Sequence, residues 1–196
     1  MEVVEAFIHS VAVTDIGFLV LLRNSRDEKM VPIFIGPMEA QSISMVLMKN
    51  IPPRPLTHDL LKNILMRIDT PLKEVHITEL RNNTFIAKIF LTRKEKSKEE
   101  TIEIDARPSD AIALALRFQK QIFINVAVVD EAGIIIEQQD EKKIHESPKI
   151  KEAIGKQTND KLGELQKELE TAVKEERYED AARVRDEIKK IIGEHN

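Results

Sequence analysis

The sequence has no cysteine and no tryptophan, and it has a single tyrosine among its 196 residues. The absence of cysteine excludes disulfide bonds, thiolate zinc sites, iron–sulfur clusters and cysteine nucleophiles. Seven phenylalanines and one tyrosine are few for a protein that stacks the bases of single strands on aromatic side chains. No apolar run approaches the 18 or so residues that span a bilayer, and the first residues do not resemble a signal peptide. We therefore expect a cytoplasmic protein without membrane contact.

The balance of charge is slightly acidic. Lys and Arg number 30 and Asp and Glu number 34, which gives a net charge of −4. This argues against a generally basic surface that binds nucleic acid, but not against a local basic patch. The hydrophobic fraction of 42% is enough for a packed core. The length suggests one domain with an appendage.

The front of the chain contains an internal repeat. Residues 31–40 align with residues 102–111, and residues 18–22 resemble residues 85–89. Each copy has an alternating strand pattern, followed by a Pro-x-acid-Ala run and an apolar helix. Each unit is therefore predicted to contain three strands followed by one helix. Polar turns are expected at 15–17, 24–28, 81–84 and 94–100. The sequence thus predicts an α+β domain, with a largely antiparallel or mixed sheet covered by helices.

Two further elements complete this domain. Apolar residues at 60, 61, 64, 65 and 68 form one face of a helix between the repeats, for which Thr57 is the expected N-cap. A last strand is expected at 121–125. We place the domain at 1–137, followed by a linker at 138–160.

The tail at 161–196 carries two apolar stripes with helical spacing. The stripes consist of Leu162, Leu165, Leu169 and Ala172, and of Ala181, Val184, Ile188 and Ile191. A short polar connection separates them, which predicts an antiparallel helical hairpin. Because so small a hairpin buries little surface alone, we expect it to bind another surface.

Two polar clusters, at 54–59 and 105–110, stand at expected helix starts. Unpaired backbone amides there favour a phosphate or a carboxylate, and Arg54 and Arg107 can add bidentate contacts to it. The carboxylates Glu39, Asp59, Asp105 and Asp110 are instead suitable ligands for Mg²⁺ or Mn²⁺. His58 is suited to proton transfer near neutral pH.

Each of these residues also has a structural interpretation. Glu39 and Asp110 fall at the third helical position, where acids cap helix amides, and Thr57 is a cap rather than a nucleophile. His58 can be a plain exposed side chain, and Asp105 can simply pair with Arg107. The basic residues Arg93, Lys94, Lys96 and Lys98 are interspersed with acids, which favours a solvated loop over a phosphate contact.

The runs at 32–40, 53–60 and 104–115 together resemble the bifunctional nuclease domain family, over residues 1–137. The tail, in particular 165–169 and 178–188, resembles the UVR motif of nucleotide-excision-repair subunits. The first resemblance implies a duplicated α+β core, self-association as a homo-oligomer, and a nuclease that acts on DNA and RNA. The family's motif positions fall on Arg54, His58, Asp59, Asp105, Arg107 and Asp110. The second resemblance implies a hairpin that binds a UVR-type partner or a second copy of itself. Phe34 stands where the family pattern has Trp.

Two hypotheses follow. In the first, the chain is a metal-assisted nuclease in which Asp105 and Asp110 bind Mg²⁺ or Mn²⁺, His58 and Asp59 take part in catalysis, and Arg54 and Arg107 bind phosphate. No organic cofactor is expected. In the second, the chain is a non-catalytic adaptor or regulator that recruits a UVR-type partner through residues 161–196.

Overall fold

The computed structural model describes residues 2–14, 17–95 and 98–136. Beyond these it describes residues 165, 168, 169, 171, 172, 177, 180, 181 and 183–185. The chain divides into two compact units, Met1–Glu146 and Ser147–Asn196. The predicted linker at 138–160 lies outside the described residues. Within the described part of the chain, no helix is both long and apolar enough to cross a membrane.

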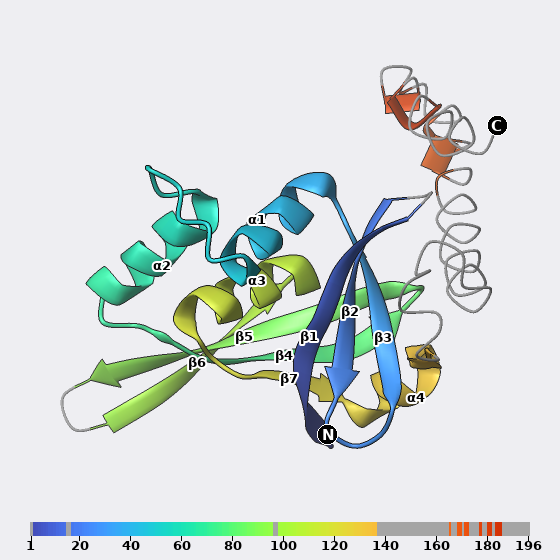
Figure 1. Ribbon diagram of the computed structural model, residues 1–196. Coiled ribbons are helices and arrows are strands. Elements are labelled where there is room, and N and C mark those ends of the chain that lie inside the picture. Colours follow the sequence, from blue (N-terminus) through green and yellow to red (C-terminus); the bar gives the residue numbers. More distant parts are fainter. Residues whose placement is uncertain are drawn as a thin grey trace. The chain divides into compact units, whose positions relative to one another are not determined.

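The first unit is built on a sheet of eight strands (Figure 1). The strands are β1 (Val3–Thr14), β2 (Gly17–Asn24), β3 (Lys29–Ile35), β4 (Leu72–Arg81), β5 (Thr84–Glu95), β6 (Lys98–Ala106), β7 (Ile122–Asn125) and β8 (Ile134–Ile135). Their order in the sheet is β6-β5-β4-β7-β1-β2-β3-β8. Only the β4–β7 pair is parallel among these strands. The predicted α+β class with a mixed, mainly antiparallel sheet is therefore confirmed.

Two three-stranded meanders flank β7, one made of β1–β3 and the other of β4–β6. Helix α1 (Pro37–Leu47) follows the first meander, and helix α3 (Pro108–Phe118) follows the second. Both helices begin at the proline that the sequence places at the first helical position, where no amide donor is lost. The order of elements is the one that the repeat predicts, while the duplication itself stays a prediction.

Helix α2 (Thr57–Arg67) connects the two halves, and helix α4 (Val126–Ala132) follows β7. The sequence predicted Thr57 as the N-cap of α2. This prediction is wrong, because Thr57 is the first helical residue. The cap position belongs to Leu56, whose N–H donates to Asp59 Oδ2 at 3.0 Å. The Asp59 carboxylate thus satisfies an amide at the helix start, which removes the need for a polar cap side chain.

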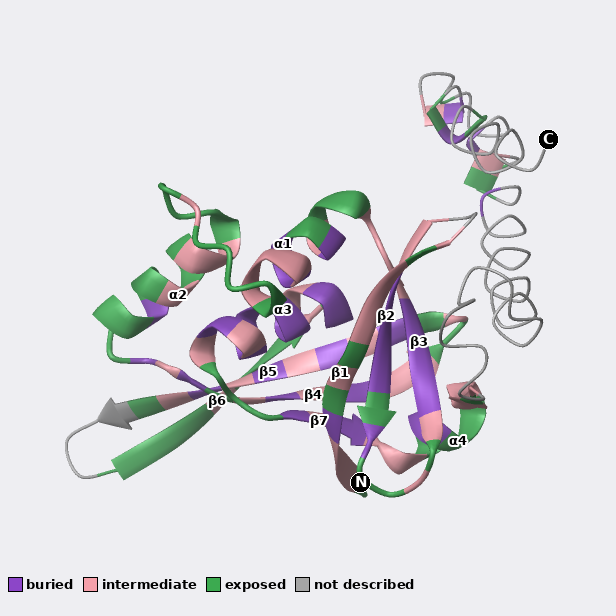
Figure 2. Cartoon of the chain, in the orientation of Figure 1, coloured by how far each residue is buried: buried purple, intermediate pink, exposed green. Residues whose placement is uncertain are grey.

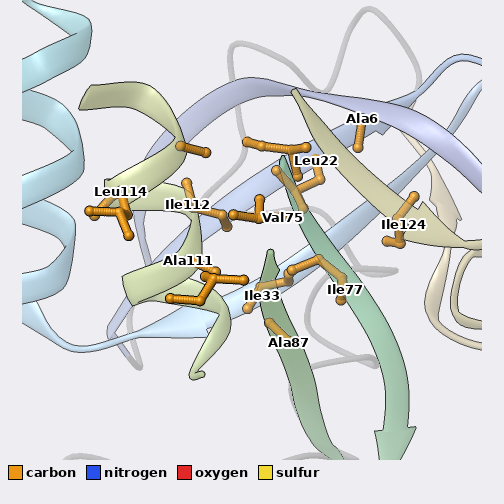
Figure 3. Close-up of a cluster of buried hydrophobic side chains, with 14 of the residues drawn as sticks. Ala6, Leu22, Ile33, Val75, Ile77, Ala87, Ala111, Ile112, Leu114 and Ile124 are labelled. Carbon is orange, nitrogen blue, oxygen red and sulfur yellow. The ribbon is translucent and has the colours of Figure 1, made fainter. Parts of the chain in front are cut away.

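The core lies between the sheet and the helices, and α3 is its centre. Residues 111–115 of α3 are all buried (Figure 2), and α3 packs on β4 and β5, which contribute Val75, Ile77 and Ala87 to the same core (Figure 3). Helices α1 and α2 both pack on α3. Because α3 is buried along its whole length, it provides a rigid base for side chains that project from its first turn.

The hairpin of β5 and β6 is longer than the sequence indicated. The polar run at 94–100 was expected to be a turn, yet β5 extends to Glu95 and β6 restarts at Lys98. The register sets Arg93 opposite Glu100 and places residue 94, a lysine, opposite Glu99. Since cross-strand positions of opposite charge stabilise antiparallel pairs, the charged run continues the strands. The expected basic loop is therefore largely strand.

Candidate functional site

Helices α1, α2 and α3 lie on one side of the sheet (Figure 1). Hydrogen bonds and ion pairs join several of their polar side chains. These side chains form a connected set that we call the three-helix cluster. It consists of Glu39 and Ser42 of α1, His58 and Asp59 of α2, Arg107, which caps α3, and Asp110 and Arg117 of α3. The set joins residues up to 78 positions apart in the sequence, so only the fold assembles it.

His58 lies between two partners. Its Nδ1 is 3.0 Å from Ser42 Oγ, and its Nε2 is 3.1 Å from Asp110 Oδ1. An ionised carboxylate only accepts hydrogen bonds, so the neutral imidazole carries its proton on Nε2 and accepts from the Ser42 hydroxyl at Nδ1. The His58 side chain is 15% exposed and that of Asp110 is 36% exposed, so Ser42 and Asp110 hold the ring at the edge of the solvent.

Arg107 connects the starts of α1 and α3. Its Nε donates to Asp110 Oδ2 at 2.8 Å, and its Nη1 is 3.1 Å from Glu39 Oε1. The Arg107 side chain is 66% exposed. A guanidinium has five N–H groups, and these contacts together with the 3.3 Å bond from Nη2 to Asp110 Oδ1 engage three of them. Donors of Arg107 thus remain directed to solvent.

Gly36 fits this arrangement because the Glu39 carboxylate folds back over the first turn of α1. A Cβ atom at Gly36 would collide with Glu39 Oε2. The carboxylates of Glu39 and Asp110 therefore hold the helix-start positions predicted for them, and both also bind Arg107.

Arg117 is the buried cation of the cluster. Its side chain is 5% exposed, and its Nε donates to Asp59 Oδ1 at 2.7 Å. Its Nη1 donates to the carbonyl oxygens of Ser42 and Ala113 at 3.2 and 3.1 Å. One guanidinium thus ties all three helices together, since Ser42, Asp59 and Ala113 belong to α1, α2 and α3.

The cluster lowers the pKa of two carboxyl groups. Burial raises the pKa of Asp110, but hydrogen bonds from Arg107 and His58 outweigh burial and hold the pKa below its usual value. Burial likewise raises the pKa of Asp59, and the Leu56 amide and Arg117 lower it by more. Both groups are therefore carboxylates at neutral pH, as the hydrogen-bond directions require.

Two predicted site residues do not join the cluster. Arg54 is exposed before α2 and has no hydrogen bond or ion pair with another described residue. Asp105 is exposed on β6 and pairs in register with Lys88, whereas the next residue pairs with Ala87, which faces α3. Because side chains alternate across a strand, Asp105 lies on the sheet face opposite α3 and its Asp110.

The described residues do not fit a metal ion shared by Asp105 and Asp110. The two acids lie on opposite sides of the sheet, and both Asp110 oxygens accept hydrogen bonds from nitrogen donors. Among the described residues, no group of three His, Asp or Glu side chains is placed to hold a metal. Two cavities, of about 530 and 320 Å³, are lined by described residues, and no cluster member lines either. The exposed side chains of Arg107 and Asp110 place this end of the cluster at the surface.

Sequence reasoning missed Ser42 and Arg117 as members of this site. Arg117 stands in an otherwise apolar helix, seven positions after Asp110, which places both on one side of α3. A lone charge in such a run is a signal of a buried ion pair. Ser42 lies in the apolar middle of α1, where a hydroxyl carries no comparable signal.

The comparison with known proteins identifies the family of the chain. The family model of the bifunctional nuclease domain matches residues 20–175, so the chain belongs to the bifunctional nuclease domain family. An uncharacterized protein of Mycobacterium tuberculosis (strain CDC 1551 / Oshkosh) is 38% identical over 118 residues, which cover 60% of this chain and 68% of that protein.

Plant proteins are also similar to the chain. "Bifunctional nuclease 1" of Oryza sativa subsp. indica is 28% identical over 183 residues, which cover 87% of this chain and 53% of that protein. "Bifunctional nuclease 2" of Arabidopsis thaliana is 27% identical over 173 residues, covering 83% and 51%. The chain spans about half the length of these plant relatives.

Proposed function

We propose that the chain is a nuclease that hydrolyses phosphodiester bonds of DNA, RNA or both, and that the three-helix cluster is its active site. The observation that carries the proposal is the His58 ring, held between Ser42 and Asp110 beside the exposed Arg107. Membership of the bifunctional nuclease domain family supports the choice of substrate. The names of the plant relatives support it as well.

The chemistry needs a phosphate contact and a proton carrier. The remaining N–H groups of Arg107 bind the phosphate oxygens, and Arg54 adds a second cation from the segment before α2. Water takes the place of the Ser42 hydroxyl at His58 Nδ1, attacks phosphorus and gives its proton to that nitrogen. The bond from phosphorus to the leaving oxygen breaks, and the protonated His58 passes the proton to the leaving oxygen. Asp110 orients the His58 ring and stabilises its protonated form. Asp59 supports the site indirectly, by fixing the first turn of α2 and Arg117.

Assistance by Mg²⁺ or Mn²⁺ is a separate proposal. Because Asp105 and Asp110 do not share one location, we propose that an ion would come with the substrate phosphate and bind few protein oxygens. Excess EDTA tests this, with activity measured before and after Mg²⁺ or Mn²⁺ is restored. Asp105→Ala tests whether Asp105 takes part, since loss of activity in that variant would support it as a ligand.

The experiment for the nuclease uses His58→Gln and Asp110→Asn, which preserve size and remove proton transfer or charge. We expect each to lower cleavage of single- and double-stranded DNA and RNA by about 10²–10⁴-fold. The control is Asp69→Asn at an exposed residue with φ of 53°, which asparagine tolerates. Equal cleavage by His58→Gln and wild-type preparations of equal stability would refute the proposal and indicate a contaminating nuclease.

A second candidate function is a non-catalytic adaptor. Its specific support is that the carboxylates of the three-helix cluster are all paired with arginine, as in a structural clamp. In the second unit, Leu165 and Val184 are buried together with Leu169 packed on them, and all three are helical. We propose that residues 161–196 form the UVR-like hairpin and bind a UVR-type partner or a second copy of the chain.

A further inference from the structure

Two consecutive hydrogen bonds join Ser42, His58 and Asp110. Ser42 Oγ lies 3.0 Å from His58 Nδ1, and His58 Nε2 lies 3.1 Å from Asp110 Oδ1. A hydroxyl, an imidazole base and a carboxylate that orients the base are the three parts of a Ser-His-Asp triad, which is recognised by geometry rather than by order in the sequence. The proposed cleavage of nucleic acid uses only the ring and the carboxylate, because water takes the place of the hydroxyl.

The directions of both hydrogen bonds make His58 a base for Ser42. Asp110 is a carboxylate that only accepts, so His58 carries its proton on Nε2 and offers the lone pair of Nδ1 to the hydroxyl. The two ring nitrogens have exchanged places relative to the serine proteases, in which the hydroxyl bonds Nε2. Either imidazole nitrogen accepts a proton, so the exchange preserves the path of the proton. A hydroxyl within hydrogen-bond reach of an oriented imidazole is an activated nucleophile.

Helix α1 contains a second serine that lacks this arrangement. Ser44 stands two residues after Ser42 and is the more exposed of the two, since Ser42 is 7% exposed. The Ser44 hydroxyl has no hydrogen bond to another described residue. Exposure alone therefore favours reaction with a dissolved reagent at Ser44, whereas activation by His58 favours reaction at Ser42.

We propose that Ser42 is a nucleophile and that the three-helix cluster also hydrolyses small carboxylic esters. Ser42 Oγ attacks the carbonyl carbon and gives its proton to His58 Nδ1, while Asp110 stabilises the protonated ring. The carbonyl oxygen takes the electron pair, and the N–H groups of Arg107 that remain directed to solvent bind it. The bond to the leaving alcohol breaks, the alcohol takes the proton from Nδ1, and the acyl group stays on Ser42. Water then attacks the acyl carbon by the same steps and releases the acid.

The burial of Ser42 favours a carboxylic ester over a phosphodiester as the group that this hydroxyl attacks. A carbonyl carbon is planar and is attacked from one face, so the ester can lie flat over a largely covered hydroxyl. A phosphodiester reacts in line, with the nucleophile and the leaving oxygen on opposite sides of phosphorus, and it needs more space above the hydroxyl. The inference goes beyond the proposed function, because it concerns a different bond and a different nucleophile.

The test uses p-nitrophenyl acetate with the full chain and without nucleic acid. Release of nitrophenolate should fall by at least about 10²-fold in Ser42→Ala and in His58→Gln, the size of a general-base contribution. The matched control Ser44→Ala removes a hydroxyl from the same helix and should keep the wild-type rate. Far-UV circular dichroism checks that the variants keep their helices. Equal rates in Ser42→Ala and the wild type would overturn the inference.

The position of the acyl group provides the second measurement, and it needs no variant. Nitrophenolate leaves readily, so the acetyl group accumulates on the wild-type chain and is trapped by acid. Mass spectrometry should find it on Ser42 within the tryptic peptide 30–49, which also contains Ser44. Acetylation of Ser44 or of lysines alone would overturn the inference.

Cleavage of DNA and RNA by the same preparation is measured separately, so the two proposals fail independently. An acetylated Ser42 in a chain that does not cleave nucleic acid would refute the proposed function and support the inference. Cleavage of nucleic acid by a chain whose Ser42 is never acetylated would refute the inference and support the proposed function.

Discussion

Arg117 shows how much a single buried side chain supports in this molecule. It satisfies the Asp59 carboxylate and two backbone carbonyls at once, on three different helices. Replacing it by methionine preserves the length of the side chain and leaves these acceptors without donors. We expect Arg117→Met to lower the free energy of unfolding by about 3 kcal/mol, measured by urea denaturation.

The control for Arg117 is Arg81, an exposed residue paired with Glu79 at 2.7 Å. Arg81→Met should change the free energy of unfolding by less than about 0.5 kcal/mol, because exposed ion pairs contribute little. If Arg117→Met cost no more than Arg81→Met, Arg117 would not be the clamp described above.

His76 is the second residue with an unusual environment. Its ring lies 4.6 Å from that of Phe90 and 5.1 Å from that of Phe123, and among the described residues neither ring nitrogen has a hydrogen-bond partner. Glu74 Oε1 is 3.3 Å from Nε2, but it is not aligned for a hydrogen bond. Burial lowers the pKa of His76 below 6.5, against the opposing effect of Glu74.

This lowered pKa predicts how stability changes with pH. Below about pH 7 the unfolded chain binds a proton at residue 76 more readily than the folded chain, so the free energy of unfolding falls as pH falls through 6.5. His76→Phe removes this dependence. Urea denaturation at pH 8 and pH 5.5 should show a smaller loss for the variant, and equal losses would contradict the buried neutral ring.

At the residue scale, the sequence predicted the positions of those site residues that depend only on neighbouring residues in the chain. Glu39 and Asp110 follow a proline at the start of a helix, which fixes their position regardless of the rest of the chain. The contact of His58 with Asp110 depends on how α2 packs on α3, which no local pattern encodes. The register of β6 sets Asp105 on the sheet face opposite Asp110, because nearness in sequence across a strand end does not keep two side chains on one face.

At the scale of elements, the end of α3 is a position where a substitution should stabilise the fold. Gln119 ends this helix with φ of 54°, in the left-handed region that glycine adopts without strain. The next amide, that of Lys120, closes the helix by donating to the carbonyl of Ala115 at 2.9 Å. Gln119→Gly should raise the free energy of unfolding by about 0.5–1 kcal/mol, measured by thermal melting.

The matched control places glycine inside a helix instead. Glu131 is exposed in α4, where Glu131→Gly should lower the free energy of unfolding by up to about 1 kcal/mol. If both glycines were destabilising, the left-handed position of Gln119 would not be the source of strain.

Elements with strong local signals were predicted, and those set by their neighbours were not. Asn82 and Asn83 were expected to form a hairpin turn, and both have positive φ, as a two-residue turn requires. Helix α4 was missed, because its run of valines favours a strand. The structure shows that Asn125 is the N-cap of α4, since its side-chain oxygen accepts a hydrogen bond from the Ala127 amide at 3.1 Å.

At the scale of the whole molecule, the two compact units predict separable properties. Deleting residues 161–196 should abolish binding of a UVR-type partner, measured by co-purification, because the apolar stripes of the tail are removed. The first unit has its own core, so its urea midpoint should stay close to that of the full chain. Retention of every partner by the shortened chain would contradict the adaptor function.

Strand β7 has a consequence for synthesis on the ribosome. It is the strand that joins the two meanders, antiparallel to β1 and parallel to β4, yet it is translated after all six of their strands. A nascent chain that stops short of Ile122 therefore has two half-sheets, whose inner edges β1 and β4 present unpaired backbone groups. The two half-sheets are joined only when β7 (Ile122–Asn125) has been synthesised and pairs with both edges. We therefore expect the chain to depend most on a chaperone before β7 leaves the exit tunnel.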